Sequence, residues 1–279
     1  MIRKLYRLQM KETGRIAKII YSLMIFITIA AVLLSLLNIP VLTSFTNTIS
    51  TLALILSAFY LVAMTVRNDY HNFQGKRGYL FRSIPAKTSE FLLSRLAYYI
   101  TYFLGTLIIL VLLLMTLTEL SSGTPVFLLA NIFLTQVIFA SPWGIGLVFY
   151  FLGAGLITII ALIFAITVGS EAKFHRLGAG GPVLFYVIYY LASQLLAIPS
   201  LFFIPLGVRI SLDSGTDAFA NFELVKEGML RYTLDNLGSA SDPDYVIIGL
   251  GFIFTAILLA VVMVILSYRS FDKKFSLRL

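Results

Sequence analysis

The sequence contains no cysteine and few charged residues. Without cysteine, the 279-residue chain can form no disulfide and offers no thiolate metal ligand or cysteine nucleophile. Charged residues make up 12% of the chain and hydrophobic residues 59%, and the mean hydropathy is +0.95. Soluble domains are roughly a quarter charged and about half apolar. This composition excludes a single soluble core and predicts an integral membrane protein.

Catalytic motifs are also missing. There is no HExxH or GxSxG motif, and the only histidines, His71 and His175, fall in segments that we expect to be solvated loops. Gly75-Lys76 lacks the upstream glycine spacing and the following Ser or Thr of a phosphate-binding loop. We therefore expect that the chain is not an enzyme, that it holds no metal or cofactor of its own, and that it does not hydrolyse ATP.

Six apolar runs are long enough to cross a membrane, which takes roughly 20 residues each. The predicted fold class is an all-α integral membrane protein with six transmembrane helices. The predicted spans lie near residues 19–38, 45–66, 92–118, 144–168, 182–207 and 245–268. Segment 126–140 is short for a crossing and contains Asn131 and Gln136. We interpret it as a re-entrant or interfacial helix on the outside, with a seventh span as the alternative.

The positive charges favour six spans with both termini in the cytoplasm. In that arrangement all of the 21 lysines and arginines except Arg209, Lys226 and Arg231 lie on the cytoplasmic side, as the positive-inside rule requires. The net charge of +8 then indicates anionic lipid headgroups as the partner, because nucleic-acid binding needs a basic soluble face.

Residues 1–18 form a basic amphipathic segment before the first predicted span. In a helix, its basic residues fall on one face and most of its apolar residues on the other. The basic residues of that face are Lys4, Arg7, Lys11, Arg15 and Lys18. This pattern predicts an interfacial helix on the cytoplasmic side. A solvated basic tail that only sets the topology is the alternative.

The cytoplasmic loop 67–91 is the longest polar interruption in the first half of the chain. Residues 75–85 predict a short amphipathic turn of helix, and proline ends it because the residue before a proline leaves the α region. The residues of this turn that we expect to contact a cytoplasmic partner are Gly75, Lys76, Arg77, Gly78, Tyr79, Leu80, Phe81, Arg82, Ile84 and Pro85.

The fifth predicted span is irregular and carries an unusual number of polar and aromatic side chains. Pro199 and Pro205 predict kinks, which membrane helices tolerate next to other helices or a polar cavity. We expect a substrate path along Tyr186, Tyr189, Tyr190, Ser193 and Gln194. The alternative is that these side chains only join neighbouring helices by hydrogen bonds.

The external segment 208–244 is acidic and polar. Between residues 217 and 232, four apolar residues fall on one side of a helix, which predicts an amphipathic helix over the outer mouth. These residues are Phe219, Phe222, Val225 and Met229. Such a helix acts as a gate, or it belongs to a solvated loop that packs on the bundle.

Loop 67–91 and the helix start that follows it, with Ser83-Ile84-Pro85 and Leu92-Leu93-Ser94-Arg95-Leu96, resemble the permease subunits of bacterial type-2 ATP-binding-cassette (ABC) exporters. At the level of architecture the resemblance covers the whole chain. This chain has Lys76-Arg77 where many members of that family carry an acidic residue.

The resemblance implies a function and a set of partners. In that family the loop is a coupling helix, seated in a groove of a separate ATPase subunit that binds ATP and Mg. Two permeases, either identical copies or paralogues, form a dimer in the bacterial cell membrane and export cargo. Aromatic residues and the lack of fixed charge favour a hydrophobic or amphipathic cargo such as a peptide, a lipid or a drug.

Two other functions are compatible with the sequence. A non-transporting scaffold or immunity protein would bind lipid or a cytoplasmic partner through loop 67–91 and would bring no ATPase with it. A secondary carrier would transport without an ATPase. The carrier is disfavoured because no ionisable residue falls in the central part of any predicted span.

Overall fold

The computed structural model describes residues 1–37, 39–73, 84, 86–139, 142–178, 180–211, 222–236 and 245–273. These residues form two compact units, and the chain passes from unit 1 to unit 2 between Ile132 and Phe133. Each unit has its own set of packed helices.

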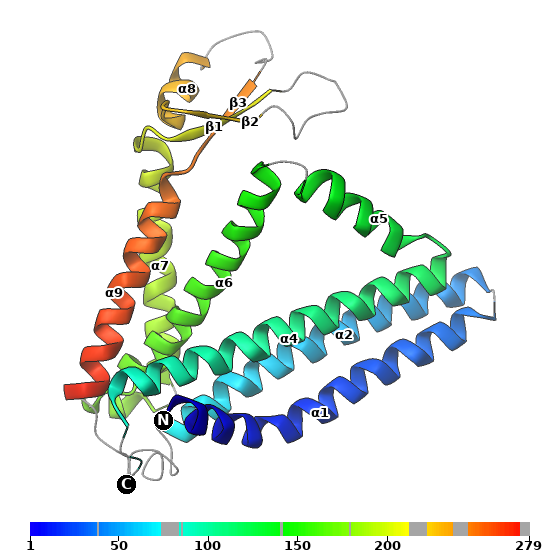
Figure 1. Cartoon of the computed structure of the whole chain (residues 1–279), viewed down its shortest axis with the longest axis horizontal. Helices are drawn as coiled ribbons and strands as arrows, with labels where there is room; N and C mark the ends of the chain where they lie inside the picture. Colours follow the sequence, from blue (N-terminus) through cyan, green and yellow to red (C-terminus); the bar gives the residue numbers. More distant parts are fainter. Residues whose placement is uncertain are drawn as a thin grey trace. The chain divides into compact units, whose positions relative to one another are not determined.

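Unit 1 consists of three long helices and one short one. The long helices are α1 (Ile2–Ser35), α2 (Pro40–Phe73) and α4 (Thr88–Ser122), which lie side by side with each in contact with the other two (Figure 1). The short helix α5 (Val126–Ile132) follows α4 after a turn at Gly123, whose φ of 69° suits glycine.

Helix α1 runs without a break from Ile2 to Ser35. The separate helix predicted over residues 1–18 is therefore the first half of a longer helix, and the predicted boundary at residue 18 is wrong. The reason is a single buried stripe that repeats every three or four residues along the whole helix. Its members are Leu5, Gln9, Thr13, Ala17, Ile20, Met24, Thr28, Ala31 and Ser35.

Polar side chains connect the three long helices of unit 1 at several levels. Helices α1 and α4 are joined by hydroxyl pairs, which include Thr13 Oγ1 with Tyr98 Oη at 2.6 Å and Tyr21 Oη with Thr106 Oγ1 at 3.1 Å. Asn68 of α2 donates to the same Thr13 hydroxyl at 3.1 Å. Such hydrogen bonds hold helices together where no hydrophobic force acts between them.

Unit 2 begins with the π-helical turn η1 (Phe133–Ile138) and contains three long helices. These are α6 (Pro142–Gly169), α7 (Gly180–Phe203) and α9 (Gly251–Lys273). The 3-10 turn η2 (Ala172–Leu177) connects α6 to α7. The three helices converge at one end, and α6 diverges from α7 and α9 toward the other (Figure 1).

A small antiparallel sheet and a short helix lie at the far end of α7 and α9. The strands are β1 (Gly207–Ser211), β2 (Phe222–Val225) and β3 (Tyr245–Gly249), in the order β2-β1-β3, and the helix is α8 (Met229–Asn236). The amphipathic helix predicted over residues 217–232 is wrong for residues 222–228, because β2 occupies residues 222–225 and the helix α8 begins only at Met229; residues 217–221 lie outside the described residues. The predicted helical start of the sixth span at residue 245 is also wrong, because β3 occupies residues 245–249. Short strands pair with distant residues, here Arg209 opposite both Glu223 and Ile247, which no local pattern reveals.

The sheet holds one arginine by three contacts. Arg209 lies 3.9 Å from the carboxylate of Glu223 and 3.7 Å from that of Glu227, and its guanidinium stands 4.6 Å from the centre of the Tyr245 ring. These contacts join all three strands and the segment after β2. Through them, two acidic residues of the polar segment 208–244, Glu223 and Glu227, gain a positively charged partner.

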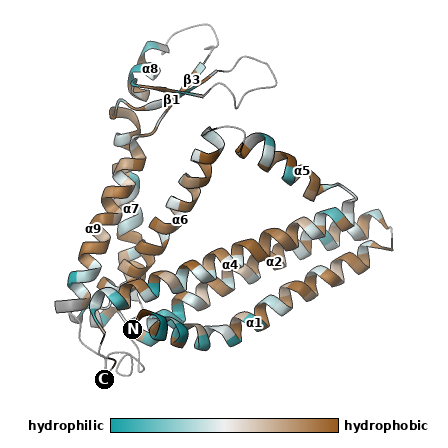
Figure 2. Cartoon of the chain, viewed as in Figure 1, coloured by the Kyte–Doolittle hydropathy of each residue, from teal (hydrophilic) through white to brown (hydrophobic). Residues whose placement is uncertain are grey.

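Six helices of the described residues are long and apolar enough to cross a membrane, namely α1, α2, α4, α6, α7 and α9. The prediction of six spans and of a helical multi-pass membrane protein is confirmed at this level. Figure 2 shows hydrophobic residues along the long helices, with hydrophilic residues in the first turns of α1. The predicted segment 126–140 forms α5 and η1, which are shorter than a span.

Candidate functional site

A cavity of about 730 Å³ lies inside unit 2, between α6, α7 and α9. It opens where α6 diverges from the other two helices. Helix α6 contributes Gly146, Phe149, Tyr150, Gly153, Ala154, Ile157 and Thr158; α7 contributes Tyr186, Tyr189, Tyr190, Ser193 and Gln194; and α9 contributes Phe252, Ile253, Ala256 and Ile257. Its volume is that of a site for a small molecule.

Tight packing closes the converging end of the three helices. A core of Ala161, Phe164, Ala260 and Met263 joins α6 to α9, with Tyr186 and Tyr189 partly buried against it. Below this core, a Cβ atom on Gly169 would lie 2.6 Å from the backbone of Gly181. The two helices therefore approach closely where both have glycine, and residues farther along α6 and α7 are left to separate.

Small residues on α6 leave the cavity open. A Cβ atom built on Gly146 or Gly153 would meet no heavy atom within 4 Å. Both glycines line the cavity, and Ala154 lies beside them. These small residues of α6, opposite the aromatic residues of α7, leave a space that the chain itself does not fill.

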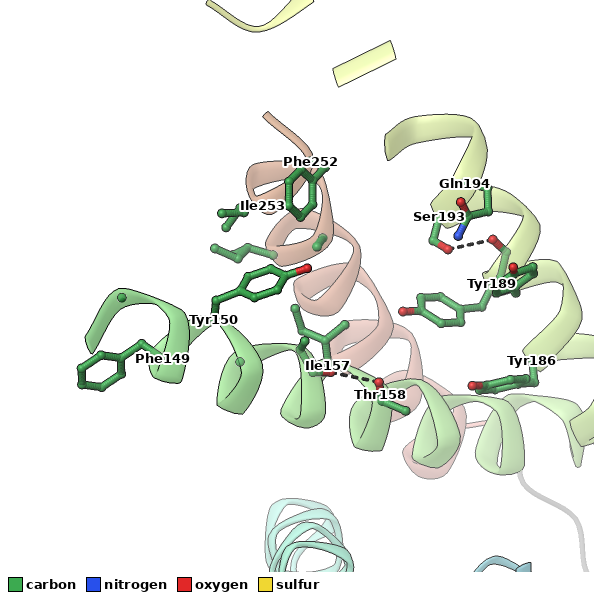
Figure 3. A pocket seen from close by; sticks show the side chains of 16 residues that line it. Phe149, Tyr150, Ile157, Thr158, Tyr186, Tyr189, Ser193, Gln194, Phe252 and Ile253 are labelled. Atoms are coloured by element: carbon green, nitrogen blue, oxygen red, sulfur yellow. Dashed lines mark hydrogen bonds between the residues drawn. The ribbon is translucent and has the colours of Figure 1, made fainter. Parts of the chain in front are cut away.

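Aromatic rings from all three helices surround this space. The rings of Tyr150 and Phe252 are 5.9 Å apart and nearly perpendicular, and those of Tyr186 and Tyr189 are 6.0 Å apart and tilted by 52°. Figure 3 shows the side chains of Tyr150 and Tyr186 entering the cavity from α6 and α7. The lining therefore presents ring faces in several orientations, together with phenolic hydroxyl groups.

The small hydroxyls of the lining are turned toward their own helices. Ser193 Oγ donates to the carbonyl of Tyr190 at 2.7 Å, and Thr158 Oγ1 donates to the carbonyl of Ala154 at 2.9 Å (Figure 3). Each hydroxyl has one proton, so both oxygens offer only lone pairs to the cavity. Among the described residues that line the cavity there is no Asp, Glu, Lys, Arg or His.

The five residues predicted to form a substrate path all lie in this lining. Tyr186, Tyr189, Tyr190, Ser193 and Gln194 fall at intervals of one, three and four along α7, so that the helix turns them toward one side. The contributions of α6 and α9 were not predicted. The glycines between residues 144 and 155, together with Tyr150, are the feature of the sequence that indicates a contribution of α6 to the cavity.

Pro199 lies inside α7, where it cannot donate to the carbonyl four residues before it. The helix nevertheless continues to Phe203, and the residue after the proline contacts α9. Ser200 Oγ donates to the carbonyl of Ala197 at 2.9 Å and lies 3.2 Å from Thr255 Oγ1. Pro199, where the sequence predicts a kink, thus lies between the cavity and the sheet. Pro205 lies beyond the end of the helix.

A second cluster lies in unit 1 at the two ends of the loop after α2, and we name it the loop anchor. It consists of Asp69, Phe73, Phe91, Arg95 and Tyr99. Arg95 Nη2 lies 2.6 Å from Asp69 Oδ2, and Arg95 Nε lies 3.0 Å from Oδ1. Tyr99 Oη donates to the same carboxylate at 3.0 Å. Both charged side chains have no exposed surface.

Aromatic contacts complete the loop anchor. The Arg95 guanidinium stands 4.8 Å from the centre of the Phe73 ring, and the rings of Phe73 and Phe91 meet edge to face at 6.1 Å. The anchor therefore binds the last turns of α2 to the first turns of α4 on both sides of the loop. The sequence places Asp69 in loop 67–91 and Arg95 at the start of the third predicted span. In the structure α2 continues to Phe73, so that Asp69 belongs to a helix and is buried against Arg95.

The residues predicted to contact a cytoplasmic partner mostly lie outside the described residues. Gly75, Lys76, Arg77, Gly78, Tyr79, Leu80, Phe81, Arg82 and Pro85 are all in that part of the chain. Ile84 is described, is partly exposed, and accepts a hydrogen bond from the amide of Ala86 at 2.9 Å. Immediately after it, the Lys87 amide donates to Glu90 Oε2 at 3.0 Å and begins α4.

The described residues hold no group of three or more His, Cys, Asp or Glu side chains that could bind a metal ion. Comparisons with known proteins add no identification: no family model, no curated protein and no solved structure matches this chain.

Proposed function

We propose that this chain is the membrane-spanning permease subunit of an ABC exporter that moves a hydrophobic or amphipathic substrate with ATP hydrolysed by a separate ATPase subunit. The observation that carries the proposal is the cavity of unit 2. It has the volume of a small-molecule site, lies among helices that can span a membrane, and contains all five residues that the sequence marks as a substrate path.

The loop anchor supports a role for loop 67–91 in energy coupling. A force on this loop acts on α2 and α4 together, because the buried ion pair and the Phe73 contacts join the two helices at the base of the loop. Coupling between two sites needs such an element, whose movement both sites can bias. The chain then continues through α4 and α5 to η1 and α6, and α6 lines the cavity.

In this proposal each step belongs to a different part of the complex. The substrate enters the cavity between α6, α7 and α9. ATP and Mg bind to the ATPase subunit, whose closure displaces loop 67–91 and with it α2 and α4. A second permease, either another copy or a paralogue, completes the translocation route in the cell membrane. Different affinities of the two conformations for substrate then give the direction of transport.

The proposal is tested by isolating the full-length chain in nanodiscs from cells that produce it and asking whether an ATPase subunit co-purifies. Replacing two apolar residues of the predicted coupling turn, Tyr79→Asp with Phe81→Asp, should release the ATPase and abolish ATP-dependent export. Leu177→Asp is the matched control, because it adds a carboxylate at an exposed apolar residue in the other predicted cytoplasmic loop.

Retention of the ATPase by the control and its loss from the double variant support the exporter. If no protein with ATPase activity accompanies the unaltered chain, the exporter proposal fails. Transport that continues without the ATPase and follows an ion gradient then identifies a secondary carrier. Absence of any transport identifies a scaffold.

A further inference from the structure

The lining of the cavity has hydrogen-bond donors and acceptors but no charged side chain among the described residues. The hydroxyl groups of Ser193 and Thr158 each donate their only proton to a carbonyl of their own helix, so their oxygens face the cavity as acceptors. The lining contains no cationic side chain among the described residues. Binding an anion in an apolar site needs donors or a positive charge to replace its water. The hydroxyl groups of the four tyrosines and the amide of Gln194 supply donors but no positive charge, so an anion finds no ionic partner in this lining.

The aromatic rings are suited to a positive charge. The face of an aromatic ring carries negative electrostatic potential and attracts cations that lie over it. Here four tyrosines and two phenylalanines from three helices line one space, and two ring pairs among them are perpendicular or tilted. A ligand in the cavity therefore meets ring faces from more than one direction, as in the aromatic cages that bind quaternary ammonium groups.

The lack of a carboxylate in the lining defines the cation further. A compact, strongly hydrated ion such as Na⁺ or a primary ammonium would lose its water without gaining an anionic partner. A cation whose charge is spread over, or shielded by, carbon atoms binds water more weakly and loses much less hydration on entering the cavity. Its apolar body fits the isoleucine, alanine and phenylalanine side chains that α6 and α9 contribute. The volume of about 730 Å³ accommodates a molecule of that kind but no folded peptide.

The amino-terminal end of α9 contributes Phe252 and Ile253 to the lining, and helix amino termini favour anions. Here the amide of Ile253 already donates to the carbonyl of Leu250 at 3.1 Å. The rest of the lining comes from the middle of α7 and from residues inside α6. The partial charge of the helix end thus acts only at the edge of the cavity.

We propose that the cavity between α6, α7 and α9 binds a lipophilic organic cation, with an aromatic or branched apolar body and a positive charge shielded by carbon. Such cations are then the cargo class of the permease, and this second statement rests on the proposed function. The binding statement itself depends only on the cavity.

The test compares two probes of nearly the same size and apolar surface but opposite charge, tetraphenylphosphonium and tetraphenylborate. The full-length chain in nanodiscs is titrated with each probe, and identical empty nanodiscs are subtracted to remove partition into lipid. Fluorescence of Trp143, the only tryptophan, reports binding, because it lies one turn before Gly146 in α6. We expect saturable binding of the cation and no saturable binding of the borate.

Two variants of Tyr190 separate the ring from its hydroxyl. Tyr190 lines the cavity and is 55% exposed, so its replacement disturbs the fold little. Tyr190→Phe keeps the ring and should bind tetraphenylphosphonium like the original chain. Tyr190→Leu removes the ring and should weaken binding about threefold to thirtyfold. Tyr268→Leu, on α9 and 46% exposed outside the lining, is the matched control and should bind normally.

Each outcome decides the inference. Equal or tighter binding of tetraphenylborate overturns it, and so does the lack of saturable binding of either probe. Equal losses in Tyr190→Phe and Tyr190→Leu show that the hydroxyl, not the ring, holds the ligand, which also overturns it. The ATPase test is separate. Cation binding without an ATPase partner contradicts only the exporter proposal. A working exporter that prefers tetraphenylborate contradicts only the cation site.

Discussion

At the scale of single residues, the buried ion pair of Asp69 and Arg95 joins α2 to α4 in unit 1. Both side chains are fully buried, and each carries a charge that water no longer stabilises. The carboxylate accepts hydrogen bonds from Arg95 and Tyr99, which offsets part of that cost. A buried pair of this kind contributes little net stability by itself, but the loss of one member leaves the other charge unpaired.

Removing one member of the pair should therefore destabilise the protein strongly. Arg95→Met leaves the Asp69 carboxylate without its cation and should lower the free energy of unfolding by about 3–5 kcal/mol. The double variant Asp69→Leu with Arg95→Met removes both charges and should recover most of that loss. Unfolding in mixed micelles with increasing SDS measures all three proteins. A double variant no more stable than Arg95→Met would show that the packing of Arg95, not its charge, is what matters.

The sequence contains a signal for this ion pair, namely the regular spacing of the residues that α2 and α4 bury. Asp69 continues the buried stripe of α2, four residues after Thr65 and eight after Leu61. A carboxylate on the buried side of a helix needs a partner, and Arg95 lies on the stripe of α4 that also carries Phe91 and Tyr98. Assigning the helix ends correctly is what makes both stripes visible.

At the scale of elements, glycines set where the helices of unit 2 touch and where they separate. A Cβ atom on Gly181 would overlap the carbonyl oxygen of Gly169, so α6 and α7 meet backbone to backbone. At the other end of α7, Gly249 and Gly251 allow the chain between β3 and α9 to approach residues 200 and 201 equally closely. Both ends of α7 are thus fixed by close contacts, with the cavity between them.

A methyl group at the first of these contacts should loosen unit 2. Gly181→Ala forces α6 and α7 apart and should cost about 1–3 kcal/mol of stability, as overpacking does in other tightly packed sites. Gly180→Ala is the neighbouring control, because its Cβ would meet no atom within 4 Å; its effect should stay within about 0.5 kcal/mol. Thermal melting of the purified proteins in detergent compares them. Equal melting temperatures for the two variants would contradict the close contact.

The sheet shows where prediction by local pattern fails. Phe222 and Val225 have the spacing of a helix face, and yet they lie in β2 beside β1. Strand pairing joins residues far apart in the chain, and a segment of four or five residues carries too little periodicity to distinguish a strand from a helix. The continuous α1 is a similar case, because its basic and apolar halves share one buried stripe.

At the scale of the whole molecule, the distribution of charge predicts which ends of the helices face the cytoplasm. Lysines and arginines gather in the first half of α1, in and beside the segment between α2 and α4, between α6 and α7, and at the end of α9 and after it. The sheet and its neighbouring segments hold the three basic residues left over and most of the acidic ones. The positive-inside rule then predicts that loop 67–91 and both termini lie on the same side of the membrane.

This topology is testable because the chain has no cysteine of its own. Lys226→Cys introduces a thiol at an exposed residue after β2, and Lys173→Cys at an exposed residue of η2. A membrane-impermeant maleimide should label the first variant in intact cells and the second only after the membrane is permeabilised. The cysteine-free parent is the control. The reverse pattern would place loop 67–91 outside the cell and exclude an ATPase partner there.

The sequence by itself determined the class of the protein, the number of its long apolar helices and the residues of α7 that line the cavity. These follow from composition and from local periodicity, which a single helix expresses without its neighbours. Only the tertiary structure decided that Asp69 and Arg95 form a buried pair, that α6 and α9 complete the cavity, and that a sheet follows α7. Each of these depends on residues brought together from distant parts of the chain, and the pattern of any one segment does not record its partner.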